Sequence, residues 1–279
     1  MQSLFRSELL AREFEENGFV VLPFLTEKEV NEIKQLFNKY KPREGNYHIY
    51  SNLEDNSPAV NLTIENKISE IFQRSIDSTF CNYKIYGGSY LVKGTGIDSA
   101  TTLHQDWNIV DESTDTSLTI WVPIQDVDET NGCLQVIPGS HRWFSSIRSS
   151  NISSLYIKFE SNIQKALVSL PVKAGTAVVF AFNLFHGSKP NQTQNLRKAV
   201  HLALVNQQAE TIHYIRDTAN KKILKVRCDK NFLYKEMFDI VKGKIPAQLD
   251  IIDSFPDDGT FTINEKHFWE RINSSNTLV

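Results

Sequence analysis

The sequence predicts a mainly β fold, a sandwich or barrel, with helices gathered in its first eighty residues. From residue 82 to residue 206, seven short apolar segments alternate with turns rich in Gly and Pro, and few helices fit between them. Before this region, three segments repeat apolar side chains at the spacing of one helix face. We therefore expect a single domain of residues 1–279, with helical support (1–80), a β core (81–206) and a C-terminal extension (207–279).

The N-terminal helices have recognisable ends. Gly18 closes the first helix, because glycine readily adopts the backbone conformation that ends a helix. Thr26 with Glu29 forms the capping-box pattern of a helix start. We expect helices at 7–18, 26–40 and 64–80, a strand at 19–24, and a polar loop at 42–58 that either covers a site or is a solvated connection.

The β core is expected to consist of strands with turn signals between them. After residue 210 only one further segment has a clear period, and it predicts a helix at 231–243. The tail at 249–272 has no clear period and is left unassigned. The expected core strands are 83–93, 101–110, 117–127, 132–138, 166–172, 176–182 and 198–206.

Composition limits the kinds of partner. The formal net charge is -3 and no block of like charge occurs, so nothing favours binding to nucleic acid. Cys81, Cys133 and Cys228 are widely spaced, which is typical of a reducing compartment. No apolar run reaches the roughly 18 residues of a membrane helix, and the first residues lack a signal-peptide core. We expect a cytoplasmic protein that binds a small molecule, and we leave its oligomeric state open.

One predicted strand carries polar side chains that suit a metal. His104 and Asp106 lie two positions apart in segment 101–110, and strand alternation would place both, with Asn108, on one face. Two histidines and one carboxylate on one side of an iron(II) ion form the site of many oxygenases. His186, expected where an apolar strand ends and a turn starts, is the candidate third ligand. Three other histidines lie in polar or irregular surroundings and are expected to be solvated: His48, His213 and His267.

Arg197 follows His186 by eleven residues, across the turn-rich segment GSKPNQTQNL. This segment reads as a hairpin connection, so a strand would begin at Arg197 beside the strand that ends at His186. Alternation would turn Arg197, Ala199 and His201 to one face, and no acidic residue lies in that strand. The guanidinium therefore pairs either with an acidic residue elsewhere or with a dicarboxylate co-substrate held by two parallel hydrogen bonds.

Four segments occur in a fixed order: NGFVVLPFLTEKEVNEIKQLF, LHQDW, IWVPIQDVDETNGCLQVIPGSH and FHGSKPNQTQNLRKAVHLALV. Together they resemble the phytanoyl-CoA dioxygenase family of iron(II)- and 2-oxoglutarate-dependent oxygenases. The resemblance covers residues 17 to 206 and leaves out the extension and the loop near residue 50. It implies a double-stranded β-helix, a jelly-roll or cupin-like barrel with helices packed on one side.

The resemblance also implies a site. Fe(II) would be held by His104, Asp106 and His186, and 2-oxoglutarate would bind the iron and Arg197, with O2 as the second co-substrate. The family uses a hydroxyl where Ser188 stands and a tryptophan where Trp121 stands, although Ser188 also suits a turn and Trp121 a core position. Lys93 matches a basic or amide side chain that some members place upstream. Halogenases of this fold lose the carboxylate, so the presence of Asp106 argues against halogenation.

The implied reaction is hydroxylation of an unactivated C–H bond, with succinate and CO2 as co-products. The same cofactor chemistry also allows desaturation, cyclisation or demethylation. Trp107, Asn108 and His201 are candidate substrate contacts, the last two alternatively supporting a ligand. Nothing indicates the basic surface that coenzyme A phosphates require, so we expect a small polar metabolite, an amino acid or a natural-product intermediate. The alternatives are a protein-modifying oxygenase and a non-catalytic relative that binds a metal or ligand.

Overall fold

The computed structural model describes residues 3–40, 48–54, 57–152, 155, 163–259 and 263–275. Its N-terminal part contains α1 (Glu8–Asn17), β1 (Phe19–Pro23), α2 (Glu27–Lys39), β2 (Ile49–Ser51) and α3 (Pro58–Thr79). The core strands are β3 (Tyr83–Lys93), β4 (Thr101–His104), β5 (Ser117–Pro123), β6 (Leu134–Val136), β7 (Val168–Leu170), β8 (Thr176–Ala181), β9 (His186–Ser188) and β10 (Arg197–Asn206). The extension contains β11 (Ile212–Asp217), β12 (Lys222–Arg227), α4 (Lys230–Lys235), α5 (Met237–Val241), β13 (Asp250–Pro256) and α6 (Glu265–Ser275).

Two antiparallel sheets form the double-stranded β-helix. The larger has the order β1-β8-β5-β10-β3-β2 and the smaller the order β4-β9-β6-β7. Consecutive strands frequently belong to different sheets, as expected of a jelly roll. The predicted fold class is therefore confirmed, and β3 has the predicted limits.

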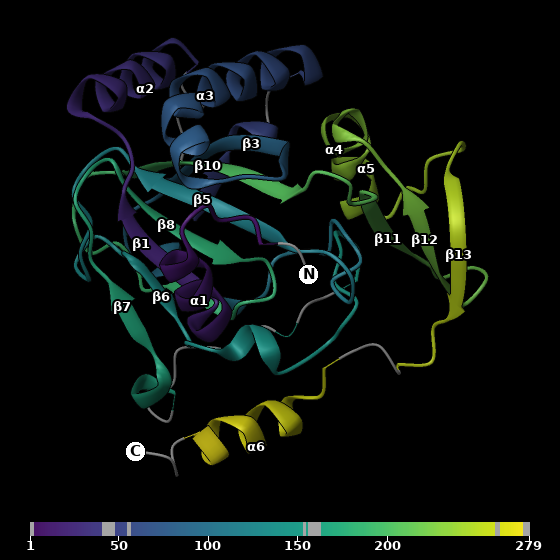
Figure 1. Cartoon of the computed structure of the whole chain (residues 1–279). Helices are drawn as coiled ribbons and strands as arrows, with labels where there is room; N and C mark the ends of the chain where they lie inside the picture. Colours follow the sequence, from purple (N-terminus) through teal and green to yellow (C-terminus); the bar gives the residue numbers. More distant parts are fainter. Residues whose placement is uncertain are drawn as a thin grey trace.

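Helices α2 and α3 lie over the larger sheet (Figure 1). Ile33 of α2 and Phe72 of α3 are fully buried in the same core as Val92 of β3. The third helix begins at Pro58 and not at residue 64, because the Ser57 side chain accepts a hydrogen bond from the backbone of Val60 and proline suits a first helical position.

The strand predicted at 101–110 ends at His104. The Gln105 side chain is buried and donates to the carbonyl of Asn183 at 2.5 Å, and the backbone N–H of Asp106 donates to the carbonyl of Phe182 at 2.8 Å. The chain therefore leaves the sheet and is tied to a neighbouring loop. The prediction that strand alternation aligns Asp106 and Asn108 with His104 is wrong.

The strand pairing predicted around His186 is also wrong. β8 ends at Ala181, and His186 begins β9, a separate strand that pairs with β4 and β6. Arg197 does begin β10, as predicted, but β10 pairs with β5 and β3 in the other sheet. The turn-rich segment is therefore a crossover between the sheets and not a hairpin within one, a difference that local turn signals do not reveal.

The extension adds a three-stranded antiparallel sheet, β11-β12-β13, beside the barrel (Figure 1). The helix predicted at 231–243 is present as two short helices, α4 and α5. Phe268 of α6 is fully buried against Phe185, with ring centroids 5.0 Å apart, so the last helix packs behind the strand that starts at His186. Among the described residues no helix combines the length and apolarity that a membrane span requires.

Candidate active site

Three side chains converge at two neighbouring strands of the smaller sheet and the loop that follows one of them. His104 of β4 lies directly opposite His186 of β9 in the strand pairing, and their ring centroids are 4.5 Å apart. Asp106 Oδ1 lies 3.8 Å from His104 Nε2 and 3.7 Å from His186 Nε2. One ligand atom from each of the three residues lies within 4.8 Å of the others, so a single ion fits between them. This is the donor set of non-haem iron(II) oxygenases.

Both histidine rings are held in the tautomer that a metal requires. His104 Nδ1 lies 2.8 Å from the carbonyl of Thr102, and His186 Nδ1 lies 3.0 Å from the carbonyl of Leu184. A carbonyl only accepts hydrogen bonds, so each Nδ1 carries the proton and each Nε2 offers a lone pair to the metal. Burial, reinforced by the nearby His186, lowers the pKa of His104 to about 4, which keeps this ligand neutral at pH 7.

Arg148 holds the loop that carries Asp106. Its side chain is only 1% exposed; Nε donates to the backbone carbonyl of Asp106 at 2.7 Å, and Nη2 pairs with Glu112 at 2.5 Å. The backbone N–H of Arg148 donates to Asn108 Oδ1 at 2.7 Å. The backbone after the metal-binding carboxylate is therefore fixed from two directions, and sequence reasoning missed this arginine.

Replacing Arg148 by lysine is expected to lower Fe(II) affinity by about tenfold, since a lysine lacks the fork whose separate nitrogens reach Asp106 and Glu112, and outer partners of metal ligands typically contribute 10- to 100-fold. Glu112→Gln is the matched control: it weakens the buried ion pair but leaves the bond to Asp106, so it should reduce the melting temperature and spare iron affinity. Anaerobic Fe(II) titration and thermal unfolding measure the two effects. Wild-type iron affinity in Arg148→Lys would show that the arginine is only structural.

Two buried cations lie side by side in the larger sheet. Arg197 and Lys93 are direct partners in the pairing of β10 with β3, and each is at most 2% exposed. Arg197 donates through Nη1 to the carbonyl of Gly132 at 3.0 Å, while its buried Nε has no hydrogen-bond partner among the residues that the structure describes. Its guanidinium lies 5.1 Å from the ring centroid of Trp121. Lys93 donates to the carbonyl of Ser99.

Burial lowers the pKa of Arg197 to about 10, and burial together with the charge of Arg197 lowers the pKa of Lys93 to about 7. Within the described ranges, neither cation has an ion pair, so the structure does not bear out the alternative of an internal salt bridge for Arg197. A buried arginine with an unpaired donor fits an anion that enters from outside. The site therefore suits the carboxylate of a dicarboxylate co-substrate.

The metal cluster and Arg197 open onto one cavity of about 500 Å³. Trp121, Ser188, Trp107 and His201 line it as well, and the Ser188 hydroxyl donates to Thr101 Oγ1 at 3.3 Å. Lys93 and Asn108 lie outside its lining. The Asn108 side chain instead accepts a hydrogen bond from the backbone N–H of Arg148. Lys93 Nζ lies 3.5 Å from Oγ1 of Thr101, which is a lining residue.

Several lining residues were not predicted, since they carry no sequence signal of their own. One of them is Thr119, whose Oγ1 lies 3.5 Å from Asp106 Oδ2. Ser89 is outside the lining, but its Oγ lies 2.6 Å from Nε2 of the lining residue His201. The prediction of a loop at 42–58 is wrong for part of that segment, because residues 49–51 form β2, which pairs with β3. Ile49 and Leu53 of this segment line the cavity, and Arg43 and Tyr47 lie outside the described residues.

His213 was expected in solvent, and this is wrong. It is fully buried in β11, and its ring centroid lies 6.2 Å from that of Trp107.

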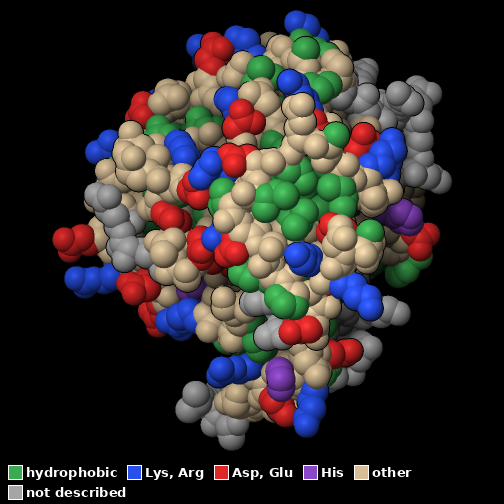
Figure 2. All heavy atoms as spheres, turned by 90° about the vertical axis from the view of Figure 1, so that its right-hand side faces the viewer, with side chains coloured by type: hydrophobic (Ala, Val, Ile, Leu, Met, Phe, Trp, Pro, Cys, Tyr) green, Lys and Arg blue, Asp and Glu red, His purple; other side chains and the backbone are tan. Residues whose placement is uncertain are grey.

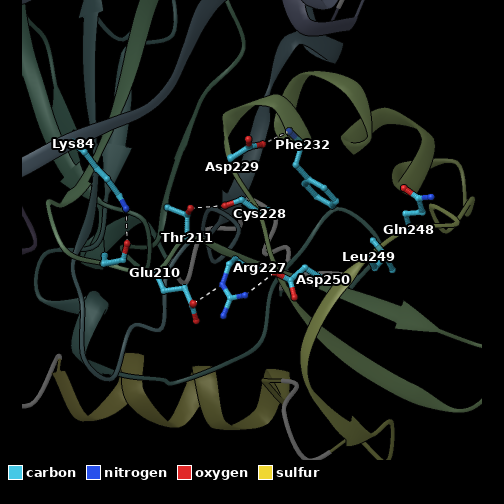
Figure 3. Close-up of a pocket in the computed structure, with 11 residues that line it drawn as sticks. Lys84, Glu210, Thr211, Arg227, Cys228, Asp229, Phe232, Gln248, Leu249 and Asp250 are labelled. Atoms are coloured by element: carbon cyan, nitrogen blue, oxygen red, sulfur yellow. Dashed lines mark hydrogen bonds and ion pairs between the residues drawn. The ribbon is translucent and has the colours of Figure 1, made fainter.

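A second hollow of about 480 Å³ lies beside α4 (Figure 3). Its charged side chains have partners within the protein: Arg227 pairs with Glu210 and Asp250, each at 2.6 Å, and Lys84 donates to the backbone carbonyl of Ala209 at 2.5 Å. The metal-binding cluster is in the other cavity, which is therefore the candidate active site.

Known proteins resemble this chain in sequence and in fold. A phytanoyl-CoA dioxygenase of Arabidopsis thaliana is 33% identical over 121 residues, which cover 42% of this chain and 42% of that protein. The peroxisomal phytanoyl-CoA dioxygenase of Homo sapiens is 32% identical over 111 residues, covering 35% of this chain and 31% of that protein. These matches span less than half the length of either relative.

Two solved structures share the fold. The epimerase SnoN, crystallised with Fe3+, alpha ketoglutarate and nogalamycin RO, has a TM-score of 0.51 and 17% identity, over 73% of this chain and 85% of SnoN. EvdO2 from Micromonospora carbonacea var. aurantiaca has a TM-score of 0.50 and 19% identity, over 74% of this chain and 94% of EvdO2. The family profile of phytanoyl-CoA dioxygenase (PhyH) matches residues 14–199, more than half of the sequence. The chain therefore belongs to the phytanoyl-CoA dioxygenase family of iron- and 2-oxoglutarate-dependent oxygenases.

Proposed function

We propose that this protein is an Fe(II)- and 2-oxoglutarate-dependent oxygenase that hydroxylates an unactivated C–H bond of a small molecule. The observation that carries the proposal is that three metal ligands and one buried guanidinium, which has no ion pair among the described residues, open onto a single cavity. The overall reaction consumes substrate, O2 and 2-oxoglutarate, and it yields an alcohol, succinate and CO2. One oxygen atom enters the alcohol and the other enters succinate.

The chain's own residues bind and orient. His104 and His186 would hold Fe(II) through Nε2, and Asp106 through a carboxylate oxygen. Bound iron would supply the activation of O2 that oxidative decarboxylation and C–H oxidation need. Arg197 would grip the distal carboxylate of 2-oxoglutarate, with its orientation set by Gly132 and by the face of Trp121.

Ser188 and Thr101 would hydrogen-bond the same carboxylate, and Lys93 would add positive charge behind it. Trp107 and His201 line the cavity and are the proposed substrate contacts. The hydrogen bond between Asn108 and Arg148 favours a role for Asn108 in supporting the metal ligand Asp106 over direct contact with the substrate. A small polar metabolite, an amino acid or a natural-product intermediate, stays a prediction, as do desaturation, cyclisation and demethylation as alternative outcomes.

Anaerobic addition of Fe(II) and then 2-oxoglutarate to the full chain should produce a visible metal-to-ligand charge-transfer band. On exposure to O2, succinate release should rise with a subset of metabolites, and the product of such a metabolite should gain one oxygen atom. A product that loses two hydrogen atoms instead would indicate desaturation. Absence of the band at saturating Fe(II) and 2-oxoglutarate would overturn the proposal in favour of a non-catalytic relative.

Lys93 should make 2-oxoglutarate binding depend on pH. Its pKa of about 7 means that the free protein carries this charge below pH 7 and loses it above. A bound carboxylate favours the protonated amine and raises this pKa, so affinity should be constant below pH 7 and decline above it. Calorimetric titration at pH 8, in two buffers of different ionisation enthalpy, should show uptake of a proton on binding. Lys93→Met should abolish this uptake, and a wild-type protein that takes up no proton would contradict the assignment.

A further inference from the structure

Part of the cavity wall comes from the C-terminal extension, outside the segment that matches the family. Leu233 of α4 and Met237 of α5 line the same cavity as the metal ligands, whereas the family match ends at residue 199. The preceding residue, Phe232, lines the second hollow (Figure 3). The first of these helices therefore separates the two hollows, with Leu233 on the side of the active site.

The helix that carries Leu233 is fastened to the barrel. The Tyr234 hydroxyl donates to Glu65 Oε2 of α3 at 2.7 Å and accepts from the backbone N–H of Gly88 at 3.3 Å. Lys230 pairs with the same carboxylate at 3.3 Å, and Glu65 is only 1% exposed. Buried hydrogen bonds of this kind rigidify the segments that they join. The wall is therefore already formed in the free protein.

Strand β3 allows this wall to come close. A Cβ atom placed on Gly87 would lie 2.7 Å from Leu233 Cδ2, so the leucine methyl occupies space that any other residue at 87 would fill. Tyr86, Ile109 and Phe182 belong to the apolar cluster on which Leu233 packs, and all three line the cavity. The side chains around Leu233 are thus apolar.

The charged side chains that line the cavity belong to the metal site and the co-substrate site. Among the lining residues that the structure describes, Asp106 and Arg197 are the only Asp, Glu, Lys or Arg. The first belongs to the metal cluster and the second to the co-substrate site. A charged substrate group placed against Leu233 and Met237 would lose its hydration without gaining a partner, and this would greatly weaken the binding free energy.

We propose that Leu233 and Met237 determine specificity by binding an uncharged, hydrocarbon face of the substrate, such as a ring or a branched aliphatic group. This inference rests on the proposed function, since it takes the metal end of the cavity as the place of reaction. Polar groups of the substrate would then lie away from Leu233 and Met237. The charged termini of a free amino acid do not fit against this wall.

N-phenyl-1-naphthylamine, an uncharged dye whose fluorescence rises in apolar surroundings, is a suitable probe. It should bind the full chain loaded anaerobically with Fe(II) and 2-oxoglutarate. Leu233→Asp and Met237→Asp should each weaken dye binding by at least about tenfold, because each buries a carboxylate against the ring. Leu233→Trp, which keeps the wall apolar but fills the cavity, should weaken binding as well.

Val241→Asp is the matched control. Val241 is in the same helix as Met237, but it is 47% exposed and outside the cavity lining. Figure 2 shows hydrophobic side chains gathered on the face formed by the extension, where the dye could also bind; the exposed ones include Val241, Ile245 and Ile251. Dye binding to the cavity should be unchanged in this variant, whereas binding to the outer face should fall.

The charge-transfer band is read in the same samples. An intact band in Leu233→Asp, with weakened dye binding, supports the wall. An intact band with wild-type dye affinity in both aspartate variants, or a wild-type protein that does not bind the dye, overturns the wall and leaves the proposed function standing. A missing band in the wild-type protein overturns the proposed function instead.

Discussion

His104→Ala is expected to lower Fe(II) affinity by more than about 100-fold and to abolish the charge-transfer band, since even outer partners of metal ligands contribute 10- to 100-fold. His104 Nε2 is one of three ligand atoms, and its Nδ1 is committed to the carbonyl of Thr102. Within the described residues, no fourth His, Cys, Asp or Glu joins the cluster to replace it. Anaerobic titration followed by absorption measures both effects.

His201→Ala is the matched control for this experiment. His201 lines the same cavity, and burial likewise lowers its pKa to about 4, but its Nε2 contacts Ser89 and not the cluster. Its removal should leave iron affinity within about threefold of wild type, less than the 10-fold lower limit for outer partners of metal ligands. Iron should also raise the melting temperature of His201→Ala and not that of His104→Ala, because only a ligand-binding native state is stabilised by mass action. An intact band in His104→Ala would refute the metal assignment.

The sequence predicted which residues meet at this site better than it predicted how they meet. Residue types and order along the chain identified His104, Asp106 and His186, and these three do converge. The reason given for His104 and Asp106, alternation along one strand, fails because the strand ends at His104. Asp106 is positioned by two backbone hydrogen bonds, one to the carbonyl of Phe182 and one from the side chain of Arg148, and both join residues far apart in the sequence.

Strand limits were predictable where a local signal marks them. β3 and the start of β10 match the prediction, because alternating apolar residues and turn residues act over a few positions. The pairing of β10 with β3 and β5 joins residues about a hundred positions apart, and no local pattern encodes it. The helix that carries Leu233 was predicted, but its place at the cavity was not, because Leu233 gains that place only from its contact with Gly87, which is far away along the chain.

Arg197→Met is expected to weaken 2-oxoglutarate binding by roughly 100-fold, since truncating one partner of a buried charge pair costs about 2–5 kcal/mol. Methionine keeps the length and apolar volume of the side chain, so the cavity changes little. Arg197→Lys keeps the charge but loses the planar fork, and it should fall between wild type and Arg197→Met. The band titrated with 2-oxoglutarate at saturating Fe(II) gives the affinities, and equal affinities in wild type and Arg197→Met would reject the carboxylate clamp.

The same substitution should raise the stability of the protein without its co-substrate. Arg197 is buried with an unpaired Nε, and its lowered pKa shows that burial disfavours the charge. Replacing an imperfectly paired buried charge by an apolar side chain of similar volume is often neutral or stabilising by about 1–4 kcal/mol. In the wild type, 2-oxoglutarate at 100 times its dissociation constant adds about 2.7 kcal/mol, and Arg197→Met should lose this gain. Without 2-oxoglutarate the variant should therefore melt at or above the temperature of the wild type, and 2-oxoglutarate should raise the melting temperature of the wild type far more than that of the variant. A variant less stable than wild type in both conditions would mean that Arg197 supports the fold through Gly132 and Trp121, and that its charge is not held in reserve for an incoming carboxylate.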